Sequence, residues 1–85
     1  MLVPKTALET PPLEIRKLGA DALRQPARRI GKVTEQTREL ARDMLRSMYT
    51  AKGIGLAAPQ VGINQQLLVI DLDLDNPTSP PLVFI

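Results

Sequence analysis

One segment of the chain repeats its apolar positions at steps of three and four residues, which is the pattern of an amphipathic helix. The stripe consists of Val33, Thr37, Leu40, Ala41, Met44, Leu45 and Met48. Thr34 is suited to cap the helix, and Glu35 in the first turn complements the helix dipole. Lys52 and Gly53 form a stop signal, with the glycine as the left-handed cap. We therefore predict a helix from Thr34 to about residue 51.

Two apolar runs after this helix favour strands. Residues 67–70 are continuously apolar and too short for a helix, which fits a buried strand. Residues 71–75 alternate aspartate with leucine, as a strand with one wet face would. Turn-forming residues fill 76–81, and residues 82–85 begin a second apolar strand. The pattern predicts an α+β fold: one long amphipathic helix and the first strands of an antiparallel or mixed sheet.

The region before the helix has no comparable period. Residues 1–12 carry prolines and predict a loose N-terminal arm. Residues 13–30 predict an irregular segment with a turn near Gly19–Asp21. We expect this segment to wrap the core with four inward side chains, namely Ile15, Leu18, Leu23 and Ile30. The chain thus divides into an arm, 1–12, and one incomplete domain, 13–85.

Composition and charge narrow the function classes. The chain has 85 residues, 44% of them hydrophobic, which suits one small domain. All eleven Lys and Arg lie at or before Lys52. A basic half could favour RNA, but acids are interleaved with it and aromatic residues for base stacking are missing. The arginine row Arg38, Arg42 and Arg46 pairs with acids at i,i+3 spacing and suggests solvated surface. We expect no direct nucleic-acid partner.

The sequence also lacks an apolar run long enough for a signal peptide or for a membrane span of about 20 residues. We expect a cytoplasmic chain with no membrane contact. Cysteine and histidine are absent, which removes the thiolate ligand, the commonest metal ligand and the commonest general base.

The segment Gly53–Gly62 reads Gly-Ile-Gly-Leu-Ala-Ala-Pro-Gln-Val-Gly. Small residues let a backbone approach closely, and the amide of Gln60 offers both a donor and an acceptor. The first six residues match the dinucleotide fingerprint, but that motif needs a strand before it and a helix after it, and here the order is reversed. The aspartates at 71, 73 and 75 resemble a calcium loop, but its sixth and twelfth positions hold Asn76 and Leu82.

Four segments together resemble the N-terminal part of peptide deformylases. These are Leu23-Arg24-x-x-Ala27-x-x-Ile30, Met44-x-x-x-Met48-Tyr49, Gly53-Ile-Gly-Leu-Ala-Ala-Pro-Gln60 and the strand at 67–71. Ala20 stands where many members of the family have proline. The resemblance spans residues 13–85, and the N-terminal arm is similar to that of the cyanobacterial and plastid type. It implies the N-terminal portion of the deformylase fold.

The resemblance implies metal-dependent removal of the formyl group from formyl-methionyl nascent peptides, with the ribosome as a further candidate partner. Gln60 would be the catalytic donor to the oxyanion. The backbone around Ile54 and Gly55 would pair with the substrate as an added strand, and Ile54 and Leu56 would help shape the methionine pocket. Gly53 and Gly62 would be structural residues of the loop.

In that family a divalent metal, typically Fe²⁺, is held by one Cys and two His, and a Glu is the general base. This chain has no Cys and no His, so it supplies no metal ligand, and we expect it to be inactive alone. Two alternatives remain open: a non-catalytic truncated paralogue, or one half of a split enzyme that docks with the other half. A small RNA- or ribosome-binding module would rest on the basic half alone.

Overall fold

The computed structural model describes residues 3–15 and 28–85. The expected turn near Gly19–Asp21, the inward Leu18 and Leu23 and the first of the four family-like segments up to Ala27 lie outside these residues. The described elements are α2 (Glu35–Thr50), β1 (Gly55–Ala57), the 3₁₀ helix η1 (Ala58–Val61), β2 (Leu68–Ile70) and β3 (Leu82–Phe84). The α+β prediction is confirmed.

Helix α2 begins where the sequence predicts. The Thr34 hydroxyl accepts the backbone N–H of Thr37 at 3.3 Å, and the Thr37 hydroxyl accepts the backbone N–H of Thr34 at 3.3 Å. This reciprocal capping box satisfies donors that have no partner within the helix. The predicted N-cap is confirmed, and a threonine takes the place that Glu or Gln usually holds in such a box.

The end of α2 differs from the prediction in one residue. Lys52, at φ 59°, is the left-handed residue, whereas Gly53 has no positive φ. The Gly53 N–H bonds the Met48 carbonyl at 2.9 Å and the Lys52 N–H bonds the Tyr49 carbonyl at 3.0 Å, which is the Schellman arrangement. The helix ends at Thr50 with Ala51 as C-cap, so the left-handed position falls one residue before the glycine.

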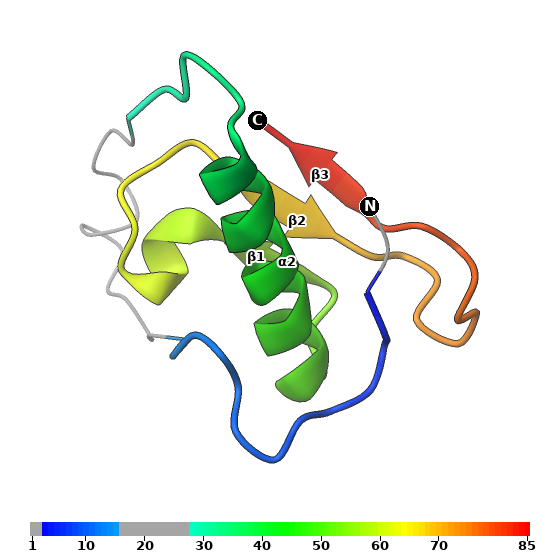
Figure 1. Ribbon diagram of the computed structural model, residues 1–85. Coiled ribbons are helices and arrows are strands. Elements are labelled where there is room, and N and C mark those ends of the chain that lie inside the picture. The colour runs from blue at the N-terminus through cyan, green and yellow to red at the C-terminus, as the bar shows by residue number, and fades with distance from the viewer. Residues whose placement is uncertain (1–2, 16–27) are drawn as a thin grey trace.

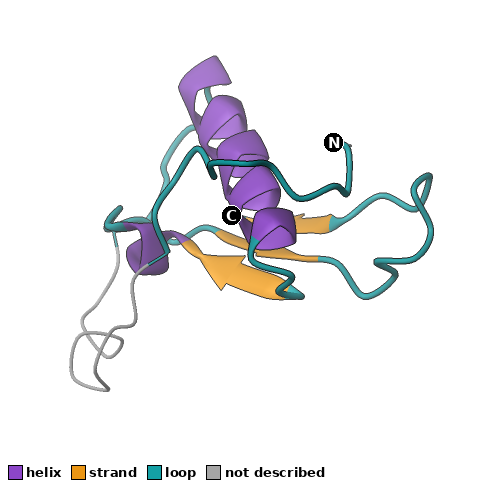
Figure 2. Ribbon diagram, turned by 90° about the horizontal axis from the view of Figure 1, so that it is seen from below, coloured by secondary structure: helices purple, strands orange, loops and turns teal. Residues whose placement is uncertain are grey.

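The three strands form one antiparallel sheet in the order β1-β2-β3. Leu56, Val69 and Val83 share one register row, and their neighbours in the strands point to the other face. Helix α2 lies on the side of this row, and no described helix covers the opposite side of the strands (Figures 1 and 2). The core between helix and sheet therefore uses only one face of the sheet.

The buried face of α2 extends further than the predicted stripe. Ala41, Met44, Leu45 and Met48 are buried as predicted, but Val33 is 45% exposed and lies outside the core. Ser47 and Tyr49 are also buried, although the stripe omitted them. The Ser47 hydroxyl donates to the Asp43 carbonyl at 2.8 Å, which lets a polar side chain enter the core.

Residues 71–75 are not a strand, and the predicted exposure is wrong for Asp71, although Asp73 and Asp75 are exposed as predicted. β2 stops at Ile70, and a bend and turn follow. The Asp71 side chain is 1% exposed, whereas Leu72 is 77% exposed, the reverse of the predicted orientation. The alternating pattern mispredicts Asp71 because burial disfavours a carboxylate only when it lacks partners, and this carboxylate has partners inside the fold.

The side-chain partners of Asp71 are Lys5 and Tyr49, and these three residues form the Asp71 cluster. Asp71 Oδ2 lies 2.8 Å from Lys5 Nζ and accepts the Tyr49 hydroxyl at 2.6 Å, while Asp71 Oδ1 accepts the Asp73 N–H at 2.9 Å. Burial alone would raise the pKa of the Asp71 carboxyl. The hydrogen bonds from Lys5, Tyr49 and the Asp73 backbone, together with the Lys5 charge, lower it below its ordinary value of 3.8. Burial and the bond to Asp71 raise the pKa of the Tyr49 phenol.

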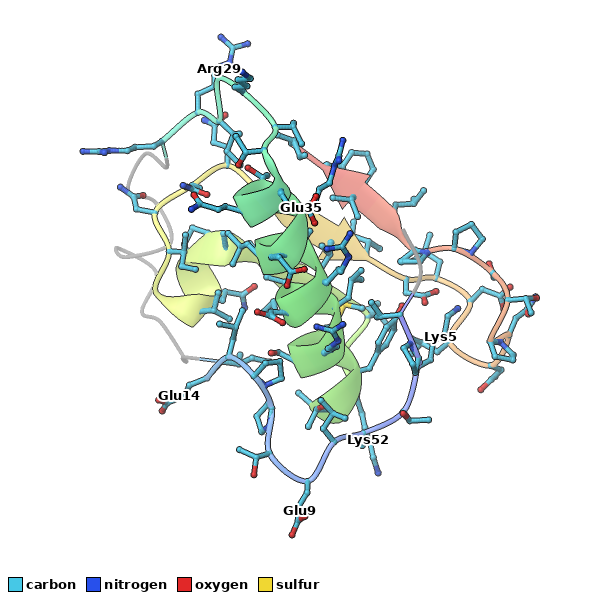
Figure 3. The ribbon with its side chains drawn as sticks, in the orientation of Figure 1. Lys5, Glu9, Glu14, Arg29, Glu35 and Lys52 are labelled. Carbon is cyan, nitrogen blue, oxygen red and sulfur yellow. The ribbon has the colours of Figure 1, made fainter. Side chains whose placement is uncertain are left out.

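The described part of the N-terminal arm is irregular but attached, where the sequence led us to expect a loose segment. Val3 is buried in the core. The Leu8 N–H donates to the Thr50 hydroxyl at 3.1 Å, and the Leu13 N–H donates to the Ser47 hydroxyl at 3.0 Å. The arm therefore runs along the C-terminal half of α2, and its labelled Lys5 lies beside the segment that leaves β2 (Figure 3).

Replacing Lys52 by glycine tests the strain at the end of α2. A left-handed conformation costs an L-residue roughly 1–2 kcal/mol, and glycine avoids this cost. We expect Lys52→Gly to raise the free energy of unfolding by about 1 kcal/mol in urea titration. Lys52→Ala removes the charge but keeps the strain, so an equal gain with alanine would contradict this explanation.

The Asp71 cluster predicts a specific acid sensitivity. Because the pKa of Asp71 is lower in the folded state, the unfolded state takes up the proton first. The contribution of Asp71 is thus complete above about pH 4 and is lost as the pH falls through the lowered pKa. Unfolding free energies measured from about pH 5 downward should fall less steeply in Asp71→Asn than in the unchanged chain. Asp73→Asn is the control, and an unchanged slope in Asp71→Asn would refute the assignment.

Candidate functional site

The segment Gly53–Gly62 is built from an edge strand and a 3₁₀ turn. β1 pairs with β2 on one side, and the described residues place no strand along its other side. η1 follows β1 directly, with Pro59 near its start. Proline suits the first positions of a helix because its fixed φ matches and its missing N–H would have no partner there. The glycine-rich segment therefore contains an edge strand that ends abruptly at the 3₁₀ helix η1.

The backbone hydrogen bonds show which groups of β1 face outward. The Asp71 N–H donates to the Ile54 carbonyl at 2.8 Å, and the Ala58 N–H donates to the Leu67 carbonyl at 2.9 Å. In an antiparallel pair, inward and outward residues alternate. Ile54, Leu56 and Ala58 therefore face β2, whereas the N–H and C=O groups of Gly55 and Ala57 point to the outer edge.

Within residues 3–15 and 28–85, no contact requires glycine at position 55. A Cβ added there would meet the Val69 carbonyl oxygen at 3.7 Å and Ile70 Cγ1 at 3.8 Å, which are ordinary contacts. Gly55 also has no positive φ. A glycine that the fold does not need leaves the outer edge open to the close approach of another backbone.

Gln60 folds back onto the same edge. Its side-chain oxygen Oε1 accepts the Ala57 N–H at 2.9 Å, so one outward group of β1 is used by the chain itself. Because a backbone N–H must face an acceptor, this bond settles the orientation of the amide. The Nε2 group, a double donor, therefore lies on the far side of the amide from Ala57. The site thus presents a donor whose direction is set by the backbone.

Two glycines of the segment differ in their roles. Gly62 has φ 81° and closes η1, and its N–H donates to the Pro59 carbonyl at 3.1 Å. The left-handed position explains the glycine at 62. Gly53 completes the cap of α2 through its N–H, a bond that any residue except proline can make.

The two apolar side chains expected to contact substrate differ in their exposure. Ile54 is 58% exposed and is available to a ligand. Leu56 is 2% exposed and points toward α2 with the core. The backbone groups of Leu56 face β2 and its side chain packs in the core, so in this structure Leu56 supports the strand and offers no group to a ligand at the outer edge.

The sheet face opposite α2 is apolar and open. Leu82 and Phe84 in β3 and the adjoining Ile85 are each about half exposed. A hollow of about 330 Å³ lies beside them. Its walls are formed by Ala57, Pro59, Gln65, Gln66, Leu67, Leu68, Phe84 and Ile85. Exposed apolar area of this kind marks a surface that another segment or protein covers.

The residues present do not fit the metal implied by the family resemblance. The sequence contains no Cys and no His. Within residues 3–15 and 28–85, no group of three or more acidic side chains is placed to hold a metal ion. Asp71, the first aspartate of the calcium-like pattern, is instead bonded to Lys5 and Tyr49. The site therefore consists of a strand edge and an amide donor.

Lys5 and Asp71 contribute to this region although no local sequence pattern indicated that they would. Asp71 bonds the β2-facing carbonyl of Ile54 just before β1, and Lys5 bonds Asp71 from a segment that is remote in the sequence. A local pattern could not have found Lys5, because its partner lies 66 positions further along the chain. For Tyr49 the sequence contains a weak indication of a polar partner, since the hydroxyl of a buried tyrosine usually forms a hydrogen bond.

Together, the fold and the site define a small α+β chain with an open strand edge suited to an extended peptide. The family model of polypeptide deformylase matches residues 12–85. The chain therefore belongs to the peptide deformylase family. No helix in the described part of the chain is long and apolar enough to cross a bilayer.

Individual relatives agree with this assignment. A peptide deformylase of Parasynechococcus marenigrum is 87% identical over the whole chain, which spans 42% of that protein. The structure is similar to a Synechococcus elongatus peptide deformylase in complex with actinonin, with a TM-score of 0.93, 53% identity and coverage of 100% and 46% of the two chains. A plant peptide deformylase matches with a TM-score of 0.77 and 33% identity over 93% and 43%. The chain thus spans less than half the length of these relatives.

Alanine substitutions separate the glycines that the fold requires from the one that it does not. Gly62→Ala places a Cβ at a left-handed position and should lower the free energy of unfolding by roughly 1–2 kcal/mol. Gly55→Ala should change it by less than about 0.5 kcal/mol, because no contact in the chain is violated. Urea titration of both variants checks this, and a large loss in Gly55→Ala would mean that the fold itself needs this glycine.

Proposed function

We propose that the chain supplies the substrate-pairing edge and one oxyanion donor of a peptide deformylase, which hydrolyses the formyl group from formyl-methionyl nascent peptides. The observation that carries this proposal is the bond from the Ala57 N–H to Gln60 Oε1, which directs the amide donor at the end of an open strand edge. The family membership of the chain supplies the reaction.

In this proposal the formylated peptide lies along β1 as an added strand. The outward N–H and C=O groups of Gly55 would pair with the peptide backbone, and the missing Cβ would allow the close approach. Ile54, exposed beside this edge, would contact the methionine side chain. Leu56 would contribute by packing between the strand and α2.

Gln60 would act on the formyl oxygen. As water adds to the formyl carbon, that oxygen gains negative charge, and Nε2 would donate a hydrogen bond to it. A donor already oriented by the Ala57 N–H needs little reorganisation during the reaction, so it favours the transition state over the free peptide. This role uses the neutral amide and involves no proton transfer by Gln60.

The metal site and general base of the family would come from residues outside this chain, and we infer that the 85 residues alone do not hydrolyse formyl peptides. Fe²⁺ is the metal we expect in the complete site. The cytoplasm, where formylated chains are made, is the location that this function requires. The open apolar sheet face favours a second candidate function, in which the chain is one half of a split enzyme or a non-catalytic paralogue that still binds a partner there.

A reconstitution experiment tests the proposal. The chain is mixed with the remaining C-terminal part of the Parasynechococcus marenigrum relative and Fe²⁺, and the release of free amine from a formyl-Met peptide is measured. We expect turnover by the mixture and none by either part alone. Gln60→Ala should lower kcat/KM by on the order of 100-fold or more.

Gln36→Ala, which removes an exposed amide on α2, is the matched control and should leave the rate unchanged. A mixture that binds but does not turn over would favour the non-catalytic paralogue. Equal rates for Gln60→Ala and the unchanged chain would refute the role of the amide. Turnover by the chain alone would refute the division of the site.

A further inference from the structure

The Asp71 cluster joins three parts of the chain at the start of β1, on the side that faces β2. Lys5 comes from the N-terminal arm, Tyr49 from the last turn of α2 and Asp71 from the end of β2. The side chains of Lys5 and Asp71 are 4% and 1% exposed, so a full ion pair lies inside the protein. Tyr49 is also buried, and its hydroxyl donates to the same oxygen that Lys5 contacts. The three side chains of the cluster are therefore buried together in the protein.

The hydrogen bonds of this cluster leave Asp71 little freedom. Lys5 Nζ donates to the Asp73 carbonyl at 2.8 Å in addition to its contact with the Asp71 carboxylate. Asp71 Oδ1 accepts the Asp73 N–H, so the carboxylate and the following backbone are held as one unit. A carboxylate with a cation, a hydroxyl and an N–H around it has both oxygens satisfied.

The same residue bonds the segment just before β1 from the side that faces β2. The Asp71 N–H donates to the Ile54 carbonyl at 2.8 Å, and Ile54 immediately precedes β1. Tyr49 is close to Ile54 in the sequence, because only the end of α2 and the turn at residues 51–53 separate the two residues. The position of Ile54, and hence of the next residue Gly55, therefore depends on where Asp71 is held.

We propose that Lys5, Asp71 and Tyr49 form a clamp that positions the outer edge of β1, so that the N-terminal arm helps to set the geometry of Gly55. They are positioning residues, since none of them lies on the outer edge. The consequence for substrate rests on the proposed function, whereas the positioning of the strand does not.

Hydrogen exchange distinguishes a clamp from general stabilisation. A contact that only adds stability protects all core amides together, whereas a clamp protects the neighbouring edge more than distant sites. Amide exchange is measured by NMR on the 85-residue chain without denaturant. In Tyr49→Phe, which keeps the ring, we expect the Asp71 and Leu56 amides to exchange at least tenfold faster, with a much smaller change at Leu45 in the centre of α2.

Lys5→Met should show the same local pattern, and Arg46→Met is its matched control because Arg46 pairs with Asp43 at the surface at 3.0 Å. Equal acceleration at Asp71, Leu56 and Leu45 in Tyr49→Phe would overturn the clamp, as would no acceleration at all. If Lys5→Met does not fold, Tyr49→Phe alone decides the question.

A second measurement links the clamp to substrate. In the reconstituted mixture, Tyr49→Phe should raise KM for the formyl peptide several-fold with a smaller change in kcat, because the peptide pairs with a displaced edge. An unchanged KM together with local exchange at Asp71 would refute the substrate consequence and leave the clamp itself supported. Failure of the mixture to turn over would refute the proposed function, while the exchange result would still decide on the clamp.

Discussion

A buried carboxylate organises this small domain. Asp71 is excluded from water, and an isolated charge in that position would strongly oppose folding. It is tolerated because Lys5 neutralises it and Tyr49 and the Asp73 N–H complete its hydrogen bonds. These partners come from the arm, the helix and the chain after β2. Satisfying one charge therefore requires all three segments to be in place, which ties the arm to a core with few aromatic residues.

Helix α2 covers one face of the sheet, and the other face is exposed (Figure 2). Helix α2 covers the row of Leu56, Val69 and Val83, while Leu82 and Phe84 point away from it and remain half exposed. The outer edge of β1 is open as well. A domain that leaves an apolar face and a strand edge uncovered is prone to association. Both features agree with a chain that spans less than half the length of the peptide deformylases that it matches.

The candidate site consists of the open strand edge and one oriented amide. The side-chain oxygen of Gln60 accepts the Ala57 N–H, which directs the side-chain nitrogen away from Ala57. A single hydrogen bond therefore orients a flexible side chain as a donor. Gly55 costs the fold little and keeps the edge open, whereas Gly62 is required by its left-handed backbone. Similar residues in one short segment thus serve different physical ends, which the sequence pattern alone did not distinguish.

The sequence by itself determined the local elements. Helix α2 and its cap at Thr34 follow from periodicity and from side chains that reach their own backbone, and the apolar runs at 67–70 and 82–85 became β2 and β3. The tertiary structure decided what depends on remote partners. Asp71 turned inward against its alternating pattern because Lys5 was there to neutralise it, and the left-handed residue after α2 became Lys52. The outward direction of Gly55 came from pairing with β2. Such outcomes depend on contacts between distant residues, whose energies no local pattern contains.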